Sequence, residues 1–368
     1  MNKKNTLLLI STLIIIFFIS ELTLRINEED TQQKTYIRHA EYNPFLIFGP
    51  KINKTIMYNN AIVGVFNAEG LRLDGELPRE KESGEYRVFA LGGSTTENIA
   101  NHKNIHYCGE ATKILKEEKI KCINAGHAAY STAQSIIRLE FDLLKYNPDA
   151  ITIMHNINDL SINFFKEDMR TNYGNAYFNI YFTQKKEEGF FNNIKQIAKL
   201  SRTIVFINEK MDIIKHKYFG KEYVTKEGKH IKSTMKMSDK QIKLHAKEQF
   251  KRNLLTLIGV AKIHNIKPIL MTQPATFSEE KIIVLWGDQP YNNEVIYPPL
   301  SKWRDIFEEY NNIIREVAKE ENVSLIDMEK LLKKEESYFL DMVHYSEEGI
   351  REFAKIYAKE LKEIKENG

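Results

Sequence analysis

"RVFALGGSTTEN", residues Arg87 to Asn98, is an apolar run that leads into two glycines and then into the hydroxyl of Ser94. This pattern is typical of a strand that ends in a sharp turn and presents one side chain. Two interpretations are open at this point, a nucleophilic Ser94 or a serine that caps the next helix. The turn is not the G-x-S-x-G hydrolase elbow, because Thr96 stands where that motif needs its last glycine.

Short apolar runs alternate with amphipathic segments along the rest of the chain. The predicted strands are Arg87–Leu91, Ile120–Ala125, Ala150–His155, Lys267–Pro274 and Val323–Met328. The predicted helices are Asn104–Glu118, Thr132–Lys145, Lys302–Glu321 and Glu347–Lys365. This alternation predicts a three-layer α/β/α sandwich with a central parallel sheet, whose ligands bind at the carboxyl ends of the strands.

The bulk composition excludes several classes of protein. The chain has 368 residues, of which 42% are hydrophobic and 28% charged, which is typical of a globular protein. Its net charge of +3 is too small to indicate a nucleic-acid partner. The histidines and cysteines show no metal-ligand spacing, so neither a metal nor a cofactor is expected. We expect Cys108 and Cys122 to be two separate buried residues, because a helical and a strand position fix no Cα separation; the alternative is a disulfide in an oxidising compartment.

The N-terminus predicts a membrane attachment. Lys3 and Lys4 precede the uncharged apolar run Thr6–Ser20, which suits an uncleaved signal-anchor over residues 1–25, with a cleaved signal peptide as the alternative. The positive charge would keep the N-terminus in the cytoplasm and place the rest outside. Residues 26–86 are predicted to form a tether and N-terminal extension. The main domain is then 87–368, with an inserted helical subdomain or lid at about 161–245.

The segment "YFLDMVHYSEEG" supplies what a nucleophilic serine would need. Asp341 stands three residues before His344, directly ahead of a helix that Ser346 caps. Histidine titrates near neutral pH and suits a general base, and its other ring nitrogen needs an acceptor that Asp341 offers. The alternative is a polar loop that only caps the helix.

Two further strand ends carry candidate donors for an oxyanion. "CINAGHAAYS" ends its strand at Gly126, where the missing side chain lets a backbone N–H approach a ligand. "ITIMHNINDL" ends another strand near Asn158, whose side-chain amide is a neutral donor. Either segment alone is also ordinary turn chemistry.

These segments together resemble the SGNH (GDSL-type) hydrolases, whose four sequence blocks occur in order between Arg87 and Arg351. The segments that carry the resemblance are "ALGGSTTE", "INAGHAAYSTAQS", "NPDAITIMHNINDL" and "DMVHYSEEG". The resemblance implies a flavodoxin-like sandwich and a catalytic triad of Ser94, His344 and Asp341. It also implies an oxyanion hole made by the Ser94 and Gly126 backbone N–H groups and the Asn158 side chain. The third block departs from the usual pattern, because Asn156 stands where a glycine is common.

Three more residues are candidates for substrate binding. Gln273 ends a predicted strand at the same edge, and Trp286 lies in the loop that leaves it. Arg72 is a candidate clamp for an acyl group or carboxylate, with a surface salt bridge as the alternative. We interpret His127 and His155 as local hydrogen-bonding residues rather than as a second base.

The sequence thus predicts a membrane-attached, extracytoplasmic serine esterase that removes O-acyl groups, above all O-acetyl groups, from a cell-surface glycan. The alternatives are an O-acyltransferase supplied by an acyl-donor partner in the membrane, and a lipid esterase. A non-catalytic glycan-binding module on the same fold is the alternative from another class of protein.

Overall fold

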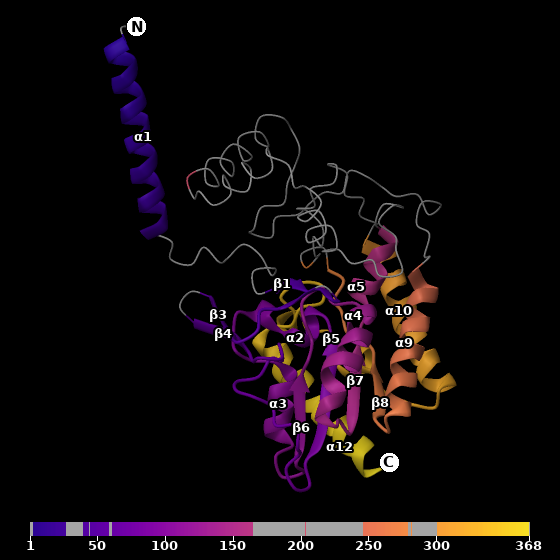
Figure 1. Ribbon diagram of the computed structural model, residues 1–368. Helices are drawn as coiled ribbons and strands as arrows, with labels where there is room; N and C mark the ends of the chain where they lie inside the picture. The colour runs from indigo at the N-terminus through magenta and orange to yellow at the C-terminus, as the bar shows by residue number, and fades with distance from the viewer. Residues whose placement is uncertain are drawn as a thin grey trace.

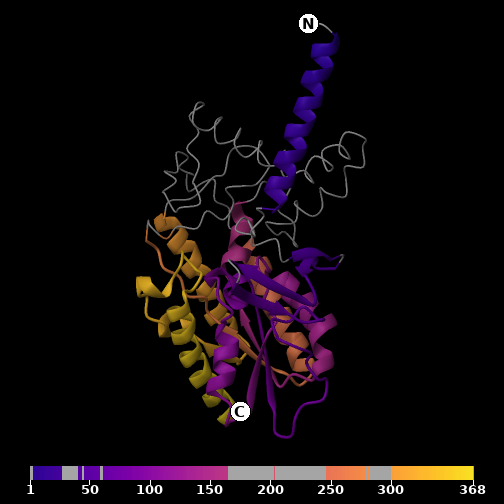
Figure 2. The same cartoon turned by 90° about the vertical axis from the view of Figure 1, so that its left-hand side faces the viewer.

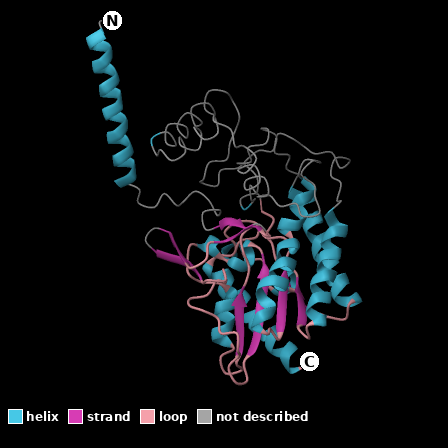
Figure 3. Ribbon diagram, in the orientation of Figure 1, coloured by secondary structure: helices cyan, strands magenta, loops and turns pink. Residues whose placement is uncertain are grey.

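Five parallel strands form the central sheet of this computed structural model (Figure 1), which describes residues 3–26, 40–43, 45–58, 61–164, 203, 246–278, 281 and 300–367. The strands are β5 (Tyr86–Gly92), β6 (Ile120–Asn124), β7 (Ala150–Met154), β8 (Lys267–Met271) and β9 (Ser324–Ile326). They lie side by side in the order β6-β5-β7-β8-β9. Figure 3 shows the strands in magenta with the helices around them in cyan. The predicted parallel sheet is therefore confirmed.

The strand order places a topological switch point in the middle of the sheet. The chain first adds β6 on one side of β5 and then returns to add β7 on the other side. In sheets of this flavodoxin-like order, the loops that leave the two strands at the switch point diverge and open a crevice at their carboxyl ends. The functional site is expected between the ends of β5 and β7.

Alternating side chains of the strands pack on two opposite faces of the sheet. In β5, Val88 and Ala90 belong to one apolar cluster, and Phe89 and Leu91 belong to the other. The first cluster contains residues of α3 (Tyr107–Ile114) and α12 (Glu347–Glu366). The second contains residues of α9 (Ala246–Ile263) and α10 (Leu300–Glu320) and of the helical segment that begins with α4 (Thr132–Arg138). Figure 2 shows these helices on the two sides of the sheet, which confirms the three-layer sandwich.

The helices differ from prediction in several places. The predicted helix Asn104–Glu118 is the shorter α3, Tyr107–Ile114. The predicted helix Thr132–Lys145 is α-helical only to Arg138 and then continues as a π-helix and a 3₁₀ turn. Helix α9 was not predicted, because it begins directly after the proposed insertion. The remaining short helices are α2 (Ser94–Glu97), η2 (Ile99–Asn101), η3 (Leu139–Leu143), η4 (Leu144–Tyr146), α5 (Ile157–Leu160), η5 (Ser161–Phe164), α11 (Met328–Leu331) and η8 (Glu336–Tyr338).

The N-terminal extension contains two antiparallel hairpins where the sequence predicted only an irregular stretch. They pair β1 (Ala40–Asn43) with β2 (Ile47–Pro50), and β3 (Lys54–Tyr58) with β4 (Ala61–Phe66). The first hairpin packs on the loop after β6, where the Tyr130 hydroxyl donates to the Phe48 carbonyl at 3.3 Å. Strand β1 has only four residues, and apolar and polar residues do not alternate in β2, β3 and β4, so a period-two pattern does not identify these strands.

The two cysteines form a disulfide, so the expectation of two separate buried residues is wrong. Cys108 in α3 and Cys122 in β6 have Cα atoms 5.3 Å apart and share an S–S bond. Helix α3 packs directly against β6, which brings the two positions together. A disulfide between elements that are adjacent only after folding was not visible in the spacing of the residues.

The predicted membrane anchor falls on α1 (Lys3–Ile26). Across the described ranges, no helix combines the length and the apolar character that a membrane crossing needs, so the anchor is not confirmed. The predicted insertion at 161–245 lies outside the described residues, apart from residues 161–164 and 203.

Candidate active site

The turn after β5 places Ser94 at the first position of α2. The N-cap of this helix is Gly93, so the Ser94 side chain does not cap it. A Cβ atom on Gly92 would lie 2.8 Å from the Met154 carbonyl oxygen, and one on Gly93 would lie 2.5 Å from the Asn158 amide nitrogen. Neighbouring atoms therefore lie too close to both positions for a side chain, which explains why this strand ends in two glycines.

A continuous chain of hydrogen bonds joins Ser94 to His344 and Asp341. The Ser94 Oγ atom lies 2.7 Å from His344 Nε2, and His344 Nδ1 lies 2.7 Å from Asp341 Oδ2. The other carboxylate oxygen, Oδ1, accepts the backbone N–H groups of Val343 at 3.0 Å and His344 at 2.8 Å. The structure thus brings together the three residues that the sequence proposed as a triad, although 250 residues separate the serine from the histidine.

The electrostatics of this chain favour a charged pair of His344 and Asp341. Burial alone would lower the pKa of His344, but the Asp341 carboxylate and also Glu97 raise it, and the net pKa lies above the ordinary value. Burial would raise the pKa of Asp341, but the charge and hydrogen bonds of His344 and the Val343 N–H lower it below its usual range. A base that gains a proton beside a fixed carboxylate is suited to accept one from Ser94.

Asn158 lies next to this serine, whereas Gly126 is engaged elsewhere. The Asn158 side-chain amide lies against Gly93 and donates to the Tyr130 carbonyl at 2.8 Å. The Gly126 N–H donates to the Asn124 side chain at 3.0 Å. Its predicted role as an oxyanion donor therefore requires this hydrogen bond to be exchanged.

Gly126 has a second, structural reason to lack a side chain. A Cβ atom there would lie 2.7 Å from the Thr96 side chain and 3.0 Å from the Glu97 nitrogen. The loop after β6 therefore packs directly on the nucleophile turn. The Asn124 amide reinforces this contact by donating to the Thr96 carbonyl at 2.6 Å.

Arg72 is not placed as a substrate clamp. It is 3% exposed, and its guanidinium donates to the backbone carbonyls of Glu97, Val63 and Lys103. Burial lowers its pKa to about 10, against the opposing charge of Glu97. Arg72 thus ties the hairpin strand β4 to the end of α2, and the hairpin that buries it is the feature that the sequence did not predict.

Glu97 and His127 form a buried pair behind the nucleophile turn that sequence reasoning did not identify as a pair. Glu97 Oε1 lies 2.7 Å from His127 Nδ1, and both side chains are almost fully buried. The His127 ring also contacts the rings of Phe48 and Phe66 from the N-terminal hairpins. This pair links the helix that begins with Ser94 to the loop after β6. The only sequence signal was a glutamate in an otherwise uncharged turn.

A second serine–histidine pair lies deeper in the fold. Ser135 Oγ is 2.7 Å from His155 Nε2, and His155 Nδ1 is 3.7 Å from Asp159. Burial lowers the pKa of His155 to about 3 and raises that of Asp159 to about 7. All three residues are at most 3% exposed, so no substrate reaches them. The arrangement is consistent with a local hydrogen-bonding role for His155.

The two other predicted substrate-binding residues have different outcomes. Gln273 reaches the predicted edge of the sheet, but its side chain is 1% exposed and points between the two turns of the site. Trp286 lies outside the described residues. Within those residues, no group of three or more His, Cys, Asp or Glu side chains is arranged to hold a metal ion.

A Ser–His–Asp chain of hydrogen bonds at the carboxyl edge of a flavodoxin-like sheet defines a serine hydrolase of the α/β/α class. The chain belongs to the GDSL-like Lipase/Acylhydrolase family, whose model matches residues 90–351. The protein is accordingly an ester hydrolase, as its sequence predicted.

Solved structures give remote similarities. A GDSL-like lipase from Bacteroides thetaiotaomicron is 14% identical, with a TM-score of 0.41 over 79% of this chain and 93% of that one. A lipase/acylhydrolase from Enterococcus faecalis is 15% identical, with a TM-score of 0.41 over 75% and 95%. The acetylxylan esterase Axe2 from Geobacillus stearothermophilus, as a catalytic mutant, is 15% identical, with a TM-score of 0.41 over 76% and 95%. No curated protein matches the chain.

Proposed function

We propose that this hydrolase cleaves carboxylic esters with Ser94 as nucleophile, His344 as general base and Asp341 as the group that orients the histidine. The observation that supports this proposal most strongly is the continuous hydrogen-bond chain from Ser94 Oγ through the His344 ring to Asp341 Oδ2, in which both hydrogen bonds are 2.7 Å long. Such a series transfers a proton without moving any heavy atom far.

The proposed reaction has two halves. In the first, His344 Nε2 takes the Ser94 Oγ proton while Oγ bonds to the ester carbonyl carbon, and the same proton then passes to the departing alcohol oxygen. In the second, His344 deprotonates a water molecule that attacks the acyl-serine, and the proton returns to Ser94 as the acid leaves. The backbone N–H groups of Ser94 and Gly126 and the Asn158 amide would stabilise the oxyanion in both halves.

Replacing Asn158 with alanine tests the oxyanion role. We expect kcat to fall by about 10²- to 10³-fold, which corresponds to a barrier higher by about 2.7–4 kcal/mol. The substitution removes one preorganised hydrogen-bond donor, and this donor acts on the negative charge that develops in the transition state. KM should change little. Steady-state kinetics with p-nitrophenyl acetate give both constants.

Asn163→Ala is the matched control for this substitution. Asn163 is an asparagine of the same segment after β7, but it is fully buried and donates to the Leu160 carbonyl at 2.7 Å and to the Tyr310 hydroxyl at 2.9 Å. The Asn163→Ala substitution should lower the melting temperature and leave kcat within a few fold of wild type. Equal kcat values for Asn158→Ala and wild type would remove Asn158 from the oxyanion hole.

For the substrate, we propose O-acyl groups, above all O-acetyl groups, on a cell-surface glycan met outside the cytoplasm. The Cys108–Cys122 disulfide supports an oxidising compartment, since such bonds are rare in the cytosol. The N-terminal sequence, with Lys3 and Lys4 before an apolar run, supports export. An envelope polymer is the ester-bearing substrate that such an exported enzyme meets.

The substrate proposal predicts release of acetate from an O-acetylated polysaccharide by the full chain. The measurement is acetate in solution, together with the mass of the polymer fragments, for wild type and Ser94→Ala. Ser94-dependent acetate release supports the glycan esterase. Ser94-dependent acetyl transfer from p-nitrophenyl acetate to an oligosaccharide, without acetate release, would replace it with an O-acyltransferase. Ser94-dependent cleavage of phospholipid vesicles but not of polysaccharide would replace it with a lipid esterase.

A further inference from the structure

Gln273 connects the two turns that form the candidate active site. It follows β8 in the chain, and its side chain is 1% exposed. Its Nε2 atom donates to Thr95 Oγ1 at 3.3 Å, and its Oε1 atom accepts the Ile157 backbone N–H at 3.1 Å. Thr95 directly follows Ser94 and Ile157 directly precedes Asn158, so one amide contacts the neighbour of the nucleophile and the neighbour of the oxyanion donor.

The orientation of this amide is determined by its partners. A backbone N–H can only donate, so the atom of Gln273 that faces Ile157 must be the oxygen. The Nε2 group therefore faces Thr95, whose hydroxyl must accept. A buried amide that rotated away would leave two polar groups without partners, which costs more than the hydrogen bonds contribute.

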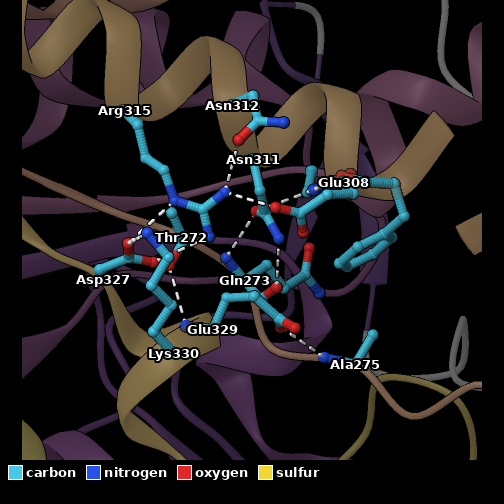
Figure 4. Close-up of polar contacts among 12 residues, drawn as sticks. Thr272, Gln273, Ala275, Glu308, Asn311, Asn312, Arg315, Asp327, Glu329 and Lys330 are labelled. Atoms are coloured by element: carbon cyan, nitrogen blue, oxygen red, sulfur yellow. Dashed lines mark hydrogen bonds and ion pairs between the residues drawn. The ribbon is translucent and has the colours of Figure 1, made fainter. Parts of the chain in front are cut away.

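The backbone of Gln273 is held as firmly as its side chain. The Asn311 side chain in α10 accepts the Gln273 N–H at 3.0 Å and donates to the Gln273 carbonyl at 3.0 Å, a two-point contact drawn in Figure 4. Asn156, at the start of the Asn158 turn, donates to the same Asn311 oxygen at 2.9 Å and to the Phe307 carbonyl at 2.9 Å. Residues 156, 273 and 311 are each at most 1% exposed.

The residue before Gln273 is anchored on its other side. The Thr272 hydroxyl donates to Asp327 and accepts the Glu329 backbone N–H, each at 2.9 Å. Arg315 from α10 binds both carboxylate oxygens of Asp327, at 2.9 and 3.0 Å (Figure 4). The end of β8 is thus a fixed support from which the Gln273 side chain extends between the two turns.

We propose that Gln273 is a positioning residue that sets the placement of Ser94 relative to Asn158, acting through Thr95 and Ile157. This inference rests on the proposed function of Ser94 and Asn158. It also replaces the sequence-based prediction that Gln273 binds substrate, because the side chain is closed off by its own partners. A general reason to expect an effect is that reacting groups displaced by about 1 Å lose on the order of 10²-fold in rate.

The first test is Gln273→Met, which keeps the length of the side chain and removes both hydrogen bonds. Full-length protein is assayed with p-nitrophenyl acetate and p-nitrophenyl butyrate, and its serine is labelled with a fluorophosphonate probe. We expect kcat and the labelling rate to fall by about 10- to 100-fold, with KM within about twofold for both esters. A residue that binds substrate would instead raise KM differently for the two esters, and that result would overturn the proposal.

The second test asks whether Gln273 acts through Thr95. Thr95→Val removes the hydroxyl that accepts from Gln273, so the double variant should lose much less activity than the product of the two single losses. Independent, multiplicative losses would contradict the proposal. Thr112→Val is the matched control, because Thr112 Oγ1 also forms internal hydrogen bonds, with Cys122 N at 2.9 Å and Cys108 O at 3.0 Å, away from both turns.

Ser94→Ala separates failure of the inference from failure of the proposed function. Turnover and labelling that disappear in Ser94→Ala but are unchanged in Gln273→Met would reject the positioning role alone. Turnover that survives in Ser94→Ala would reject the proposed function, and the inference with it. A lower melting temperature for Gln273→Met with unchanged kcat would show a purely structural role.

Discussion

Ser94→Ala should reduce kcat for p-nitrophenyl acetate by about 10⁵- to 10⁶-fold, to a rate that excess protein barely raises above background. The substitution removes the only atom that bonds to the acyl group, and the His344 ring is left 2.7 Å from where that atom stood. His344→Ala should cause a similar loss. The double variant should be no worse than either single one, because a nucleophile and its base act as a unit. Steady-state kinetics measure the loss of kcat. Mass spectrometry shows whether the acyl-enzyme still forms.

Ser135→Ala is the control that this fold supplies. It breaks a serine–histidine hydrogen bond of the same 2.7 Å length, between Ser135 and His155, but in a place that is only 1–2% exposed. We expect kcat to remain within a few fold of wild type. Loss of activity in Ser135→Ala together with retention of activity in Ser94→Ala would show that Ser94 is not the nucleophile.

The edge of the sheet at which the candidate site lies could be predicted from the sequence, because the direction of parallel strands determines where the residues after them meet. Ser94 lies in the turn just after β5 and Asn158 lies in the short helix α5 after β7, whereas His344 lies in a loop just before the last helix. Parallel strands point their carboxyl ends to one edge, so residues that follow them meet there whatever their separation in the chain. The blocks shared with a known family fixed which of the polar residues to choose.

The direction of individual side chains could not be read in the same way. Gln273 was placed at the correct edge, but only the partners Thr95, Ile157 and Asn311 show that it points inward. Arg72 is buried by a hairpin whose strands lack the apolar–polar alternation that would predict them. Both cases depend on contacts between elements that are distant in sequence, and periodicity carries no information about those contacts.

Asp341→Asn should lower kcat by about 10⁴-fold while leaving the fold intact. The oxygen of the new amide would keep the N–H groups of Val343 and His344, which lie at 3.0 and 2.8 Å from Oδ1. Its NH₂ group would then face His344 Nδ1, where the carboxylate oxygen was 2.7 Å away. An amide donor there forces the imidazole proton onto Nε2, so that the ring nitrogen facing Ser94 can no longer accept a proton.

The pH dependence distinguishes this explanation from simple loss of structure. In the wild type, His344 must be neutral to act as a base, so kcat/KM should rise with pH through a pKa that lies above the ordinary histidine value. Asp341 provides the largest of the contributions that raise this pKa, and burial, which lowers it, would remain in Asp341→Asn. The residual activity should therefore titrate at lower pH than in wild type.

Asp149→Asn is the control, because Asp149 accepts the Arg87 N–H at 2.7 Å at the opposite end of the sheet. This substitution should change neither the plateau nor the midpoint of the pH profile. A midpoint that stays in place in Asp341→Asn would show that the Asp341 charge does not govern His344, and the proposed triad would then need a different third member.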